Sequence, residues 1–219
     1  MDLDLILEKM EKEAKKRNAP IFVHKADLEP YQLLIATVLS ARTRDEQTAK
    51  AVEKLFSKAR TVEDLANLSL EDIEELIKNV GFYRVKARRI KKIAEILSKR
   101  SFPKTLEELM ELPGVGRKTA NIVLSYLGKP AIAVDTHVHR ISNRLGIVKT
   151  KNPKETEEEL KKIFPVELWG KINYVFVGFG QKICLPKKPI CWECPVSDVC
   201  KKVGVRTKDV EFGDRVYKR

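Results

Sequence analysis

Lys118 stands at the start of a predicted helix, directly after a glycine turn, where a cation is unfavourable for the helix. Gly114 and Gly116 let the backbone turn tightly and leave the amides there without a Cβ above them. Amides at a helix start, with the positive end of the helix dipole behind them, form an anion site. Arg117 and Lys118 oppose that dipole, so the two cations need an anionic partner or a chemical task.

Two short helices are predicted around this turn. The spacing at 105–108 fits a capping box that opens a helix running to Leu112, and the apolar residues at 120–127 predict a second helix that stops at Gly128. An ordinary corner between two helices would use the same glycines, and on the glycines alone the two interpretations are equal. The adjacent cations favour a helix-hairpin-helix, which binds a nucleic-acid backbone through the amides of the turn.

Asp135 ends an apolar run and is placed to cap the next predicted helix. A lysine and an aspartate at two neighbouring helix starts, beside a phosphate site, indicate chemistry on DNA. His137 and His139 follow, and a metal site of the form D-x-H-x-H is the alternative. Residues two apart on a helix point in different directions, so we expect both histidines to be structural or to face DNA.

Four cysteines lie close together with the spacing C-x6-C-x2-C-x5-C: Cys184, Cys191, Cys194 and Cys200. The N-terminus has no secretory signal, which disfavours disulfides and favours a metal site. Structural zinc uses pairs of close cysteines, and here one pair is close, so the spacing favours an iron–sulfur cluster over zinc without excluding zinc. Lys187 and Lys188, in the first loop of this segment, would then face a phosphate backbone.

The elements that must position these residues are all helical in pattern, and no segment alternates convincingly with period 2. The sequence therefore predicts an all-α fold. Expected helices lie at about 2–17, 30–41, 43–56, from 61, 69–81, 83–98, 105–112, 120–127, 135–144, 152–164 and 165–180. The helix at 83–98 is expected to be basic on one side, through Arg84, Lys86, Arg88, Arg89, Lys91 and Lys92.

The composition favours a polyanionic partner, because 43 Lys and Arg against 31 Asp and Glu give a net charge of +12. Nucleic acid, an anionic membrane and a merely solvated surface all remain open on charge alone. No stretch approaches the roughly 18 apolar residues of a membrane span, so we expect an intracellular protein of the cytoplasm or nucleoid. Charged residues make up 34% of the chain, which hints at a thermophilic, prokaryotic source.

The three motifs in this order, LPGVGRKTA at 112–120, VDTHV at 134–138 and the four-cysteine spacing, closely resemble the endonuclease III family. These are DNA glycosylase/AP lyases of the helix-hairpin-helix superfamily, and the resemblance covers nearly the whole chain. It implies a two-lobed fold whose second domain holds a [4Fe-4S] cluster on the four cysteines at 184–200. The implied domains are a central one at 21–130, and a second one that joins 1–20 to 131–219.

The resemblance implies a bifunctional DNA glycosylase/AP lyase of base excision repair that excises oxidised pyrimidines from duplex DNA. By position, Lys118 is the nucleophile that expels the base and forms a Schiff base, β-elimination then cuts the strand, and Asp135 is the acidic partner. In the adenine-mismatch branch the position that matches Lys118 resembles a serine site, and in the thymine-mismatch branch it resembles a tyrosine site. Lysine therefore favours the bifunctional enzyme, which we expect to act as a monomer on damaged or abasic sites.

One departure from the family concerns Arg42, which stands where the family often has a glutamine that fills the gap left by the flipped base. With Thr43 it forms a pair closer to the thymine-mismatch branch. Phe82, after Gly81, matches the family's apolar wedge. Two alternatives therefore stay open: a mismatch glycosylase for uracil or thymine opposite guanine, and a non-catalytic protein that binds DNA structures.

Overall fold

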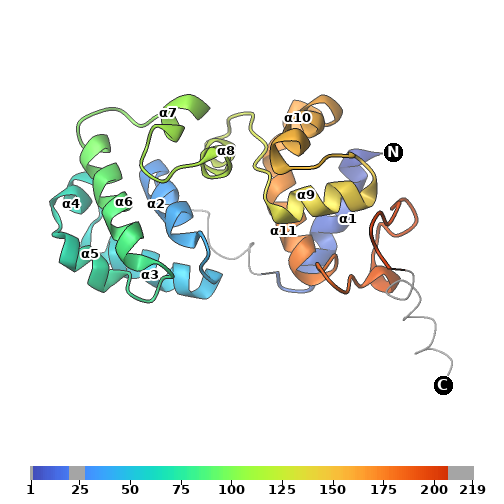
Figure 1. The fold of residues 1–219 in the computed structure, drawn as a ribbon, viewed down its shortest axis with the longest axis horizontal. Coiled ribbons are helices and arrows are strands. Elements are labelled where there is room, and N and C mark those ends of the chain that lie inside the picture. The colour runs from blue at the N-terminus through green and yellow to red at the C-terminus, as the bar shows by residue number, and fades with distance from the viewer. Residues whose placement is uncertain (1, 20–27, 207–219) are drawn as a thin grey trace, which may run out of the picture. The chain divides into compact units, whose positions relative to one another are not determined.

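The computed structural model describes residues 2–19 and 28–206 of the 219-residue chain. Every element of regular structure in these residues is a helix, which confirms the predicted all-α class (Figure 1). The chain divides into two compact units, His24–Lys129 and the pair Met1–Val23 with Pro130–Arg219. None of the described helices combines the length and the apolar character needed to cross a bilayer.

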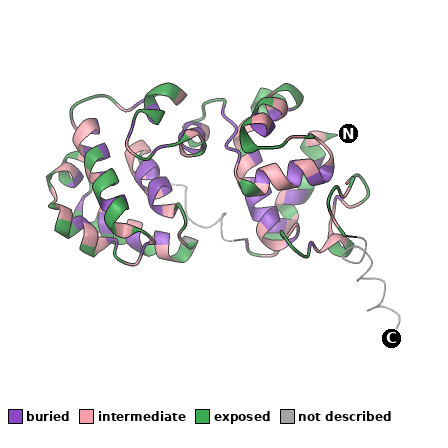
Figure 2. Ribbon diagram, viewed as in Figure 1, coloured by how far each residue is buried: buried purple, intermediate pink, exposed green. Residues whose placement is uncertain are grey.

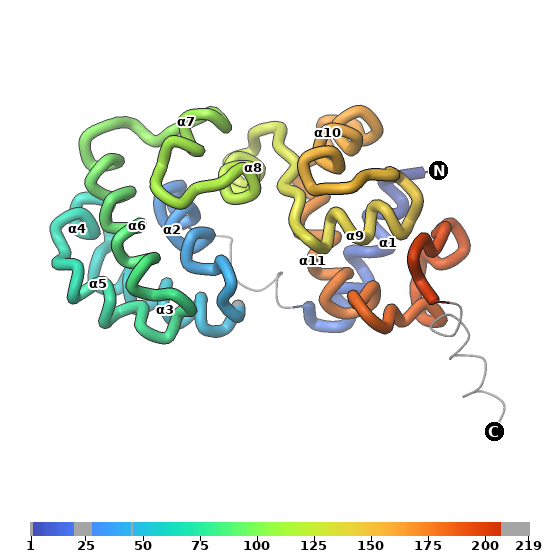
Figure 3. The backbone as a smooth tube through the Cα atoms, viewed as in Figure 1, coloured from blue at the N-terminus to red at the C-terminus, as the bar shows by residue number. Residues whose placement is uncertain are grey.

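The unit at 24–129 is built around α2, an apolar helix with six buried residues that packs against α3, α6 and α8. Its other helices follow the chain around this core, and the tube in Figure 3 traces them in order. Their bounds are α2 Pro30–Ser40, α3 Asp45–Lys58, α4 Val62–Asn67, α5 Leu70–Leu76, α6 Tyr83–Leu97, α7 Leu106–Met110 and α8 Arg117–Tyr126.

The helix starts predicted at Thr61, Ser69 and Thr105 are confirmed, because each of these side chains accepts a hydrogen bond from a backbone N–H of the first turn. The predicted cap at Thr43 is wrong. The N-cap of α3 is Arg44, and the Thr43 hydroxyl instead accepts a hydrogen bond from a lysine of α6. The helix predicted to stop at residue 81 also ends earlier, at Leu76.

The basic face predicted for α6 is wrong at Lys86, which is only 4% exposed. Lys91 is also partly buried, and its ammonium group binds the carbonyl oxygens of Ala66 and Leu68 at 2.5 and 2.7 Å, at the end of α4. Lys86 likewise donates to carbonyl oxygens at the end of another helix, α2. The charge pattern of the sequence alone does not distinguish a lysine with such internal acceptors from one that faces solvent.

The second unit packs α1 and α9 against α11, and α10 against α9. Its core is the apolar cluster that includes Met10, Ile132, Val138, Phe176 and Phe179, and the buried faces of α9 and α11 are visible in Figure 2. The bounds are α1 Leu3–Lys16, α9 Thr136–Leu145, α10 Pro153–Ile163, η2 Val166–Leu168, α11 Trp169–Lys182 and η3 Cys191–Glu193.

Candidate functional site

The predicted hairpin consists of α7, the turn at 111–116 and α8, which packs against α7. Gly114 has a φ of +77°, and a Cβ on it would lie 2.5 Å from Cδ of Arg89, so the turn needs a glycine there. Gly116 is the N-cap of α8 and offers no side chain to its first amides. Val115 between them is buried and anchors the turn.

Lys118 is the second residue of α8, and its side chain is exposed. The opposite face of α8 is fixed in the core by Ala120 and Val123, which are both fully buried. These two residues fix the rotation of α8, and the position of Lys118 in the first turn places it next to the glycine turn. Arg117, one residue earlier, is partly buried.

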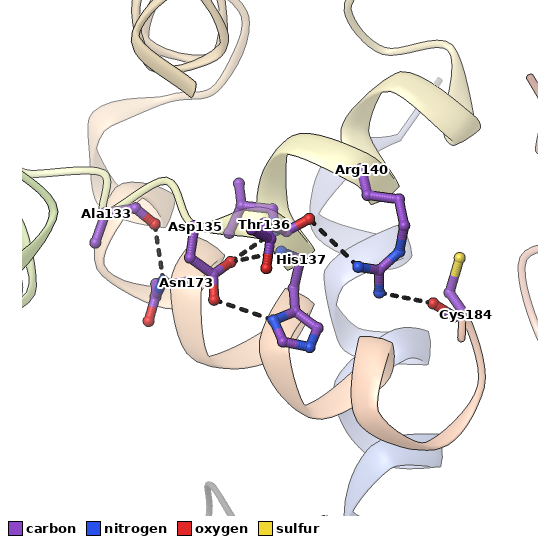
Figure 4. Close-up of polar contacts among 8 residues, drawn as sticks. Ala133, Asp135, Thr136, His137, Arg140, Asn173 and Cys184 are labelled. Atoms are coloured by element: carbon purple, nitrogen blue, oxygen red, sulfur yellow. Dashed lines mark hydrogen bonds and ion pairs between the residues drawn. The ribbon is translucent and has the colours of Figure 1, made fainter. Parts of the chain in front are cut away.

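Asp135 belongs to the other unit, where it is the N-cap of α9 (Figure 4). Its Oδ1 accepts hydrogen bonds from the backbone N–H groups of His137 and Val138 at 2.8 and 2.9 Å. Its Oδ2 lies 3.0 Å from Nδ1 of His137, and the side chain is 12% exposed. The carboxylate is thus held in one orientation by the start of its own helix.

The two histidines of this motif diverge. The His137 ring lies beside Asp135, whereas Nδ1 of His139 lies 2.7 Å from the hydroxyl of Thr156 on α10. Asn173 of α11 donates to the carbonyl oxygen of Ala133 at 2.8 Å and steadies the segment that leads into Asp135. His139 is therefore a packing residue between α9 and α10.

Two arginines on α9 bind the beginning of the cysteine loop. Arg140 donates to the carbonyl oxygens of Thr136 and Cys184, at 3.3 and 2.9 Å (Figure 4). Arg144 donates to Sγ of Cys184 at 3.4 Å and to the carbonyl oxygens of Leu185 and Pro186 at 2.7 and 2.6 Å. The helix that carries Asp135 therefore also positions this loop.

The four cysteines line one apolar hollow, whose other walls include Ile141, Phe179 and Val196. Burial raises the pKa of the Cys194 thiol to about 12 and also raises the pKa of Cys191 and Cys200. Such thiols bind a metal only as thiolates, so metal binding releases their protons to the solvent. Lys187 and Lys188 are exposed in the loop between the first two cysteines.

Four cysteines around one hollow are the donor set of an iron–sulfur cluster. Zinc would hold its thiolates about 3.8 Å apart, because each Zn–S bond is about 2.3 Å long. In the part of the chain that the structure describes, no three Cys, His, Asp or Glu side chains converge closely enough to share one ion. Each cysteine of an iron–sulfur cube binds a different corner, so wider spacing around a common centre is what that cofactor requires.

Arg42 and Phe82 are far apart in the chain but lie together in the structure. Both have left-handed backbones, with φ of 54° and 60°, which bulky residues rarely adopt. The guanidinium carbon of Arg42 lies 6.0 Å from the centre of the Phe82 ring, and Phe82 is 64% exposed. Strained backbones with exposed side chains are typical of functional sites.

Sequence reasoning missed the role of Lys86 beside this pair. A signal for it exists, because Lys86 lies on the same helical stripe as Ile90 and Ile93, which are fully buried. A lysine on the apolar stripe of a helix needs acceptors inside the protein. Lys86 has three such acceptors, which are two carbonyl oxygens and one hydroxyl group.

Fold and site together define a class of protein. Residues 35–166, more than half of the chain, match the family model described as HhH-GPD superfamily base excision DNA repair protein. Residues 184–200 match the iron–sulfur binding domain of endonuclease III. A glycine hairpin between two helices and a four-cysteine loop are the features that these two models share with the structure.

The particular family follows from similar proteins. Endonuclease III of Thermotoga maritima is 56% identical over 180 residues, which are 80% of this chain and 84% of the relative. A solved structure of a trapped endonuclease III–DNA covalent intermediate, an estranged-adenine complex, is 40% identical with a TM-score of 0.79, covering 91% of this chain and 94% of that one. The chain belongs to the endonuclease III family.

This membership confirms the predicted enzyme class and cofactor. The protein is a base excision repair DNA glycosylase with AP lyase activity, its partner is DNA, and it carries a [4Fe-4S] cluster. A thermostable thymine-DNA glycosylase is also similar, at 25% identity and a TM-score of 0.78 over 91% of this chain and 95% of that one. The fold is therefore shared with a thymine-DNA glycosylase.

Proposed function

We propose that the chain removes oxidised pyrimidines from duplex DNA and cuts the strand at the abasic site, with Lys118 as nucleophile and Asp135 as its acidic partner. The observation that carries this proposal is the exposed amine of Lys118 in the first turn of α8, beside the Gly114–Gly116 turn. A phosphate bound at that turn would bring the sugar of the damaged nucleotide to the lysine.

In the proposed reaction, the neutral amine of Lys118 attacks C1′ of the damaged nucleotide. The bond to the base breaks, and the base leaves with the electron pair and takes up a proton. The sugar ring opens to an imine on Lys118. Loss of a proton from C2′ then expels the 3′ phosphate, and water releases the lysine from the product.

Asp135 is suited to stabilise the positive charge that builds on the sugar, or to move a proton. Its two hydrogen bonds from backbone N–H groups and its contact with His137 fix the carboxylate before any substrate binds. A preoriented charge needs no reorganisation at the moment of reaction. This proposed role needs the negative charge of Asp135, whereas its role as a helix cap needs only an acceptor oxygen.

The remaining contacts bind the DNA backbone. The amides of Gly114 and Gly116, with Arg117, are proposed to hold one phosphate, and the exposed Lys187 and Lys188 to hold another. Cys184, Cys191, Cys194 and Cys200 would hold the cluster, and these ligands bracket the loop that carries the two lysines. Such contacts release counterions, so binding should weaken steeply with salt.

Arg42 and Phe82 are proposed to enter the duplex where the damaged base leaves the stack. Phe82 would stack on the neighbouring bases, and the planar donors of Arg42 suit the O6 and N7 acceptors of a guanine left without a partner. Their adjacent side chains and shared left-handed backbones support this assignment. The protein is further proposed to act as a monomer, inside the cell, on damaged or abasic sites.

A second candidate function is removal of uracil or thymine opposite guanine. The pair of Arg42 and Thr43, together with the similarity to a thymine-DNA glycosylase, favours it. A panel of duplexes that carry thymine glycol, uracil opposite guanine, thymine opposite guanine or an abasic site separates the two. We expect single-turnover excision to be fastest on thymine glycol, and faster excision of mismatched thymine would overturn the first proposal.

The alternative of a protein that only binds DNA structures does not agree with membership of the endonuclease III family, whose members are DNA glycosylases with AP lyase activity. We expect strand cleavage at the abasic site by β-elimination, because a lysine rather than a serine or tyrosine occupies position 118.

A further inference from the structure

Lys86 lies on α6 one turn after Phe82, and its side chain reaches the end of α2. Its ammonium group donates to the carbonyl oxygens of Leu39 and Ala41 at 2.7 and 2.6 Å, and to the hydroxyl of Thr43 at 2.8 Å. The three acceptors use all three hydrogens of the group. They flank Arg42 on both sides.

The same helix start also approaches this loop through its backbone. A Cβ on Gly81 would lie 2.9 Å from the carbonyl oxygen of Arg42, so a glycine is required for the approach. The N–H of Lys86 in turn donates to the carbonyl oxygen of Phe82 at 3.1 Å. One residue therefore contacts the loop of Arg42 through its side chain and the turn of Phe82 through its backbone.

Two left-handed, bulky residues need such support. Each costs about 1–2 kcal/mol relative to an ordinary backbone, and persists only where surrounding contacts hold it. Arg42 has no secondary structure of its own, because α2 ends at Ser40 and α3 starts at Asp45. Lys86 supplies the hydrogen bonds on either side of it.

Resting on the proposed function of Arg42 and Phe82, we propose that Lys86 is a positioning residue that holds the two side chains together in the arrangement in which they enter DNA. It touches neither the reacting atoms nor, by its burial, the DNA itself. Its effect on excision passes through residues 41–43 and the start of α6. A mispositioned pair lowers the rate of base removal and leaves the chemistry at an existing abasic site in place.

The test compares Lys86→Met with Lys91→Met. Lys91 is a matched control, because it lies on the same helix and binds two carbonyl oxygens of a different segment, Ala66 and Leu68. Thr43→Val is a milder second variant, which removes one of the three acceptors and keeps the lysine. Amide hydrogen exchange, thermal unfolding, single-turnover excision and cleavage of a preformed abasic site are measured for each.

We expect Lys86→Met to speed amide exchange at 40–44 and 82–85 and to lower excision at least about tenfold, with abasic-site cleavage changed less than about threefold. Thr43→Val should do the same to a smaller extent. Lys91→Met should speed amide exchange at 66–69. Its excision rate should stay normal even where its loss of thermal stability equals that of Lys86→Met. Unchanged exchange at both loops in Lys86→Met, or parallel losses of excision in the two lysine variants, would overturn the inference.

A double-mutant cycle separates this inference from the proposed function. In a protein that already carries Arg42→Ala and Phe82→Ala, Lys86→Met should lower excision no further, because the side chains it positions are absent. A further loss in that background would show that Lys86 acts by another route. If instead Arg42→Ala with Phe82→Ala alone left excision unchanged, the proposed entry of these residues into DNA would fail, whatever the exchange data show.

Discussion

Phe82→Asn should leave the stability of the protein nearly unchanged while impairing excision. Asparagine tolerates the left-handed backbone at this position, so the substitution relieves about 1 kcal/mol of strain. Because Phe82 is 64% exposed, only about a third of the 1.5–3 kcal/mol for burying a phenylalanine is lost, or about 0.5–1 kcal/mol. The two effects oppose each other, and their sum lies within about 1 kcal/mol of zero.

A change of that size shifts the melting temperature of a protein of this length by less than about 4 °C. Phe176→Ala is the control, since Phe176 is fully buried and its loss should cost about 3–5 kcal/mol. Excision of thymine glycol by the Phe82 variant should fall at least about tenfold, because the proposed stacking of Phe82 on bases would be lost. A loss of stability near that of Phe176→Ala, or an excision rate equal to that of the wild type, would refute the reasoning.

Three further predictions concern single side chains. Asp135→Asn keeps an oxygen that accepts from the N–H groups of His137 and Val138 but removes the negative charge. The rate in single-turnover assays should therefore fall at least about 10²-fold, while DNA affinity and melting temperature stay nearly unchanged. A rate equal to that of the wild type would mean that Asp135 serves only as a helix cap. Arg42→Gln should flatten the ratio of excision rates opposite guanine and adenine while abasic-site cleavage persists, whereas equal losses opposite all four bases would indicate a phosphate contact. Burial lowers the pKa of Lys86 from 10.5 to about 8, so between these pH values the unfolded chain binds more protons than the folded protein. The free energy of unfolding of the wild type, relative to that of Lys86→Met, should therefore rise with pH. Urea titrations of both proteins at pH 7.5 and 9.5 measure this, and an equal difference in unfolding free energy at the two pH values would contradict it.

Local signals in the sequence were sufficient for much of the fold. The capping residues Thr61 and Thr105 bind amides only three residues away, and Gly128 ends α8 with a φ of +69°. Such contacts depend on neighbouring residues, so short patterns predict them. The hairpin and the cap at Asp135 were predictable for the same reason.

Contacts between distant segments were not predictable in this way. The sequence around Thr43 is typical of a helix cap, but its hydroxyl accepts a hydrogen bond from Lys86 instead. Lys86 lies on α6, 43 residues further along the chain, and also donates to the carbonyl groups at the end of α2. The burial of Lys86 and the contact between Arg42 and Phe82 likewise depend on how α2 and α6 pack. Residue types and spacing identify the candidates, and tertiary packing decides which of them meet.

The most direct test of the proposed mechanism is borohydride reduction of the protein on a duplex that carries an abasic site, followed by mass spectrometry of the proteolysed adduct. An imine between enzyme and sugar becomes a permanent bond on reduction, so the peptide that carries the sugar identifies the nucleophile. We predict a single modified peptide with the sugar on Lys118, no adduct in Lys118→Ala, and a full yield in Lys129→Ala, which changes an exposed lysine just beyond the other end of α8. An adduct of equal yield in Lys118→Ala, or one mapped to another amine of the wild type, would contradict the assignment.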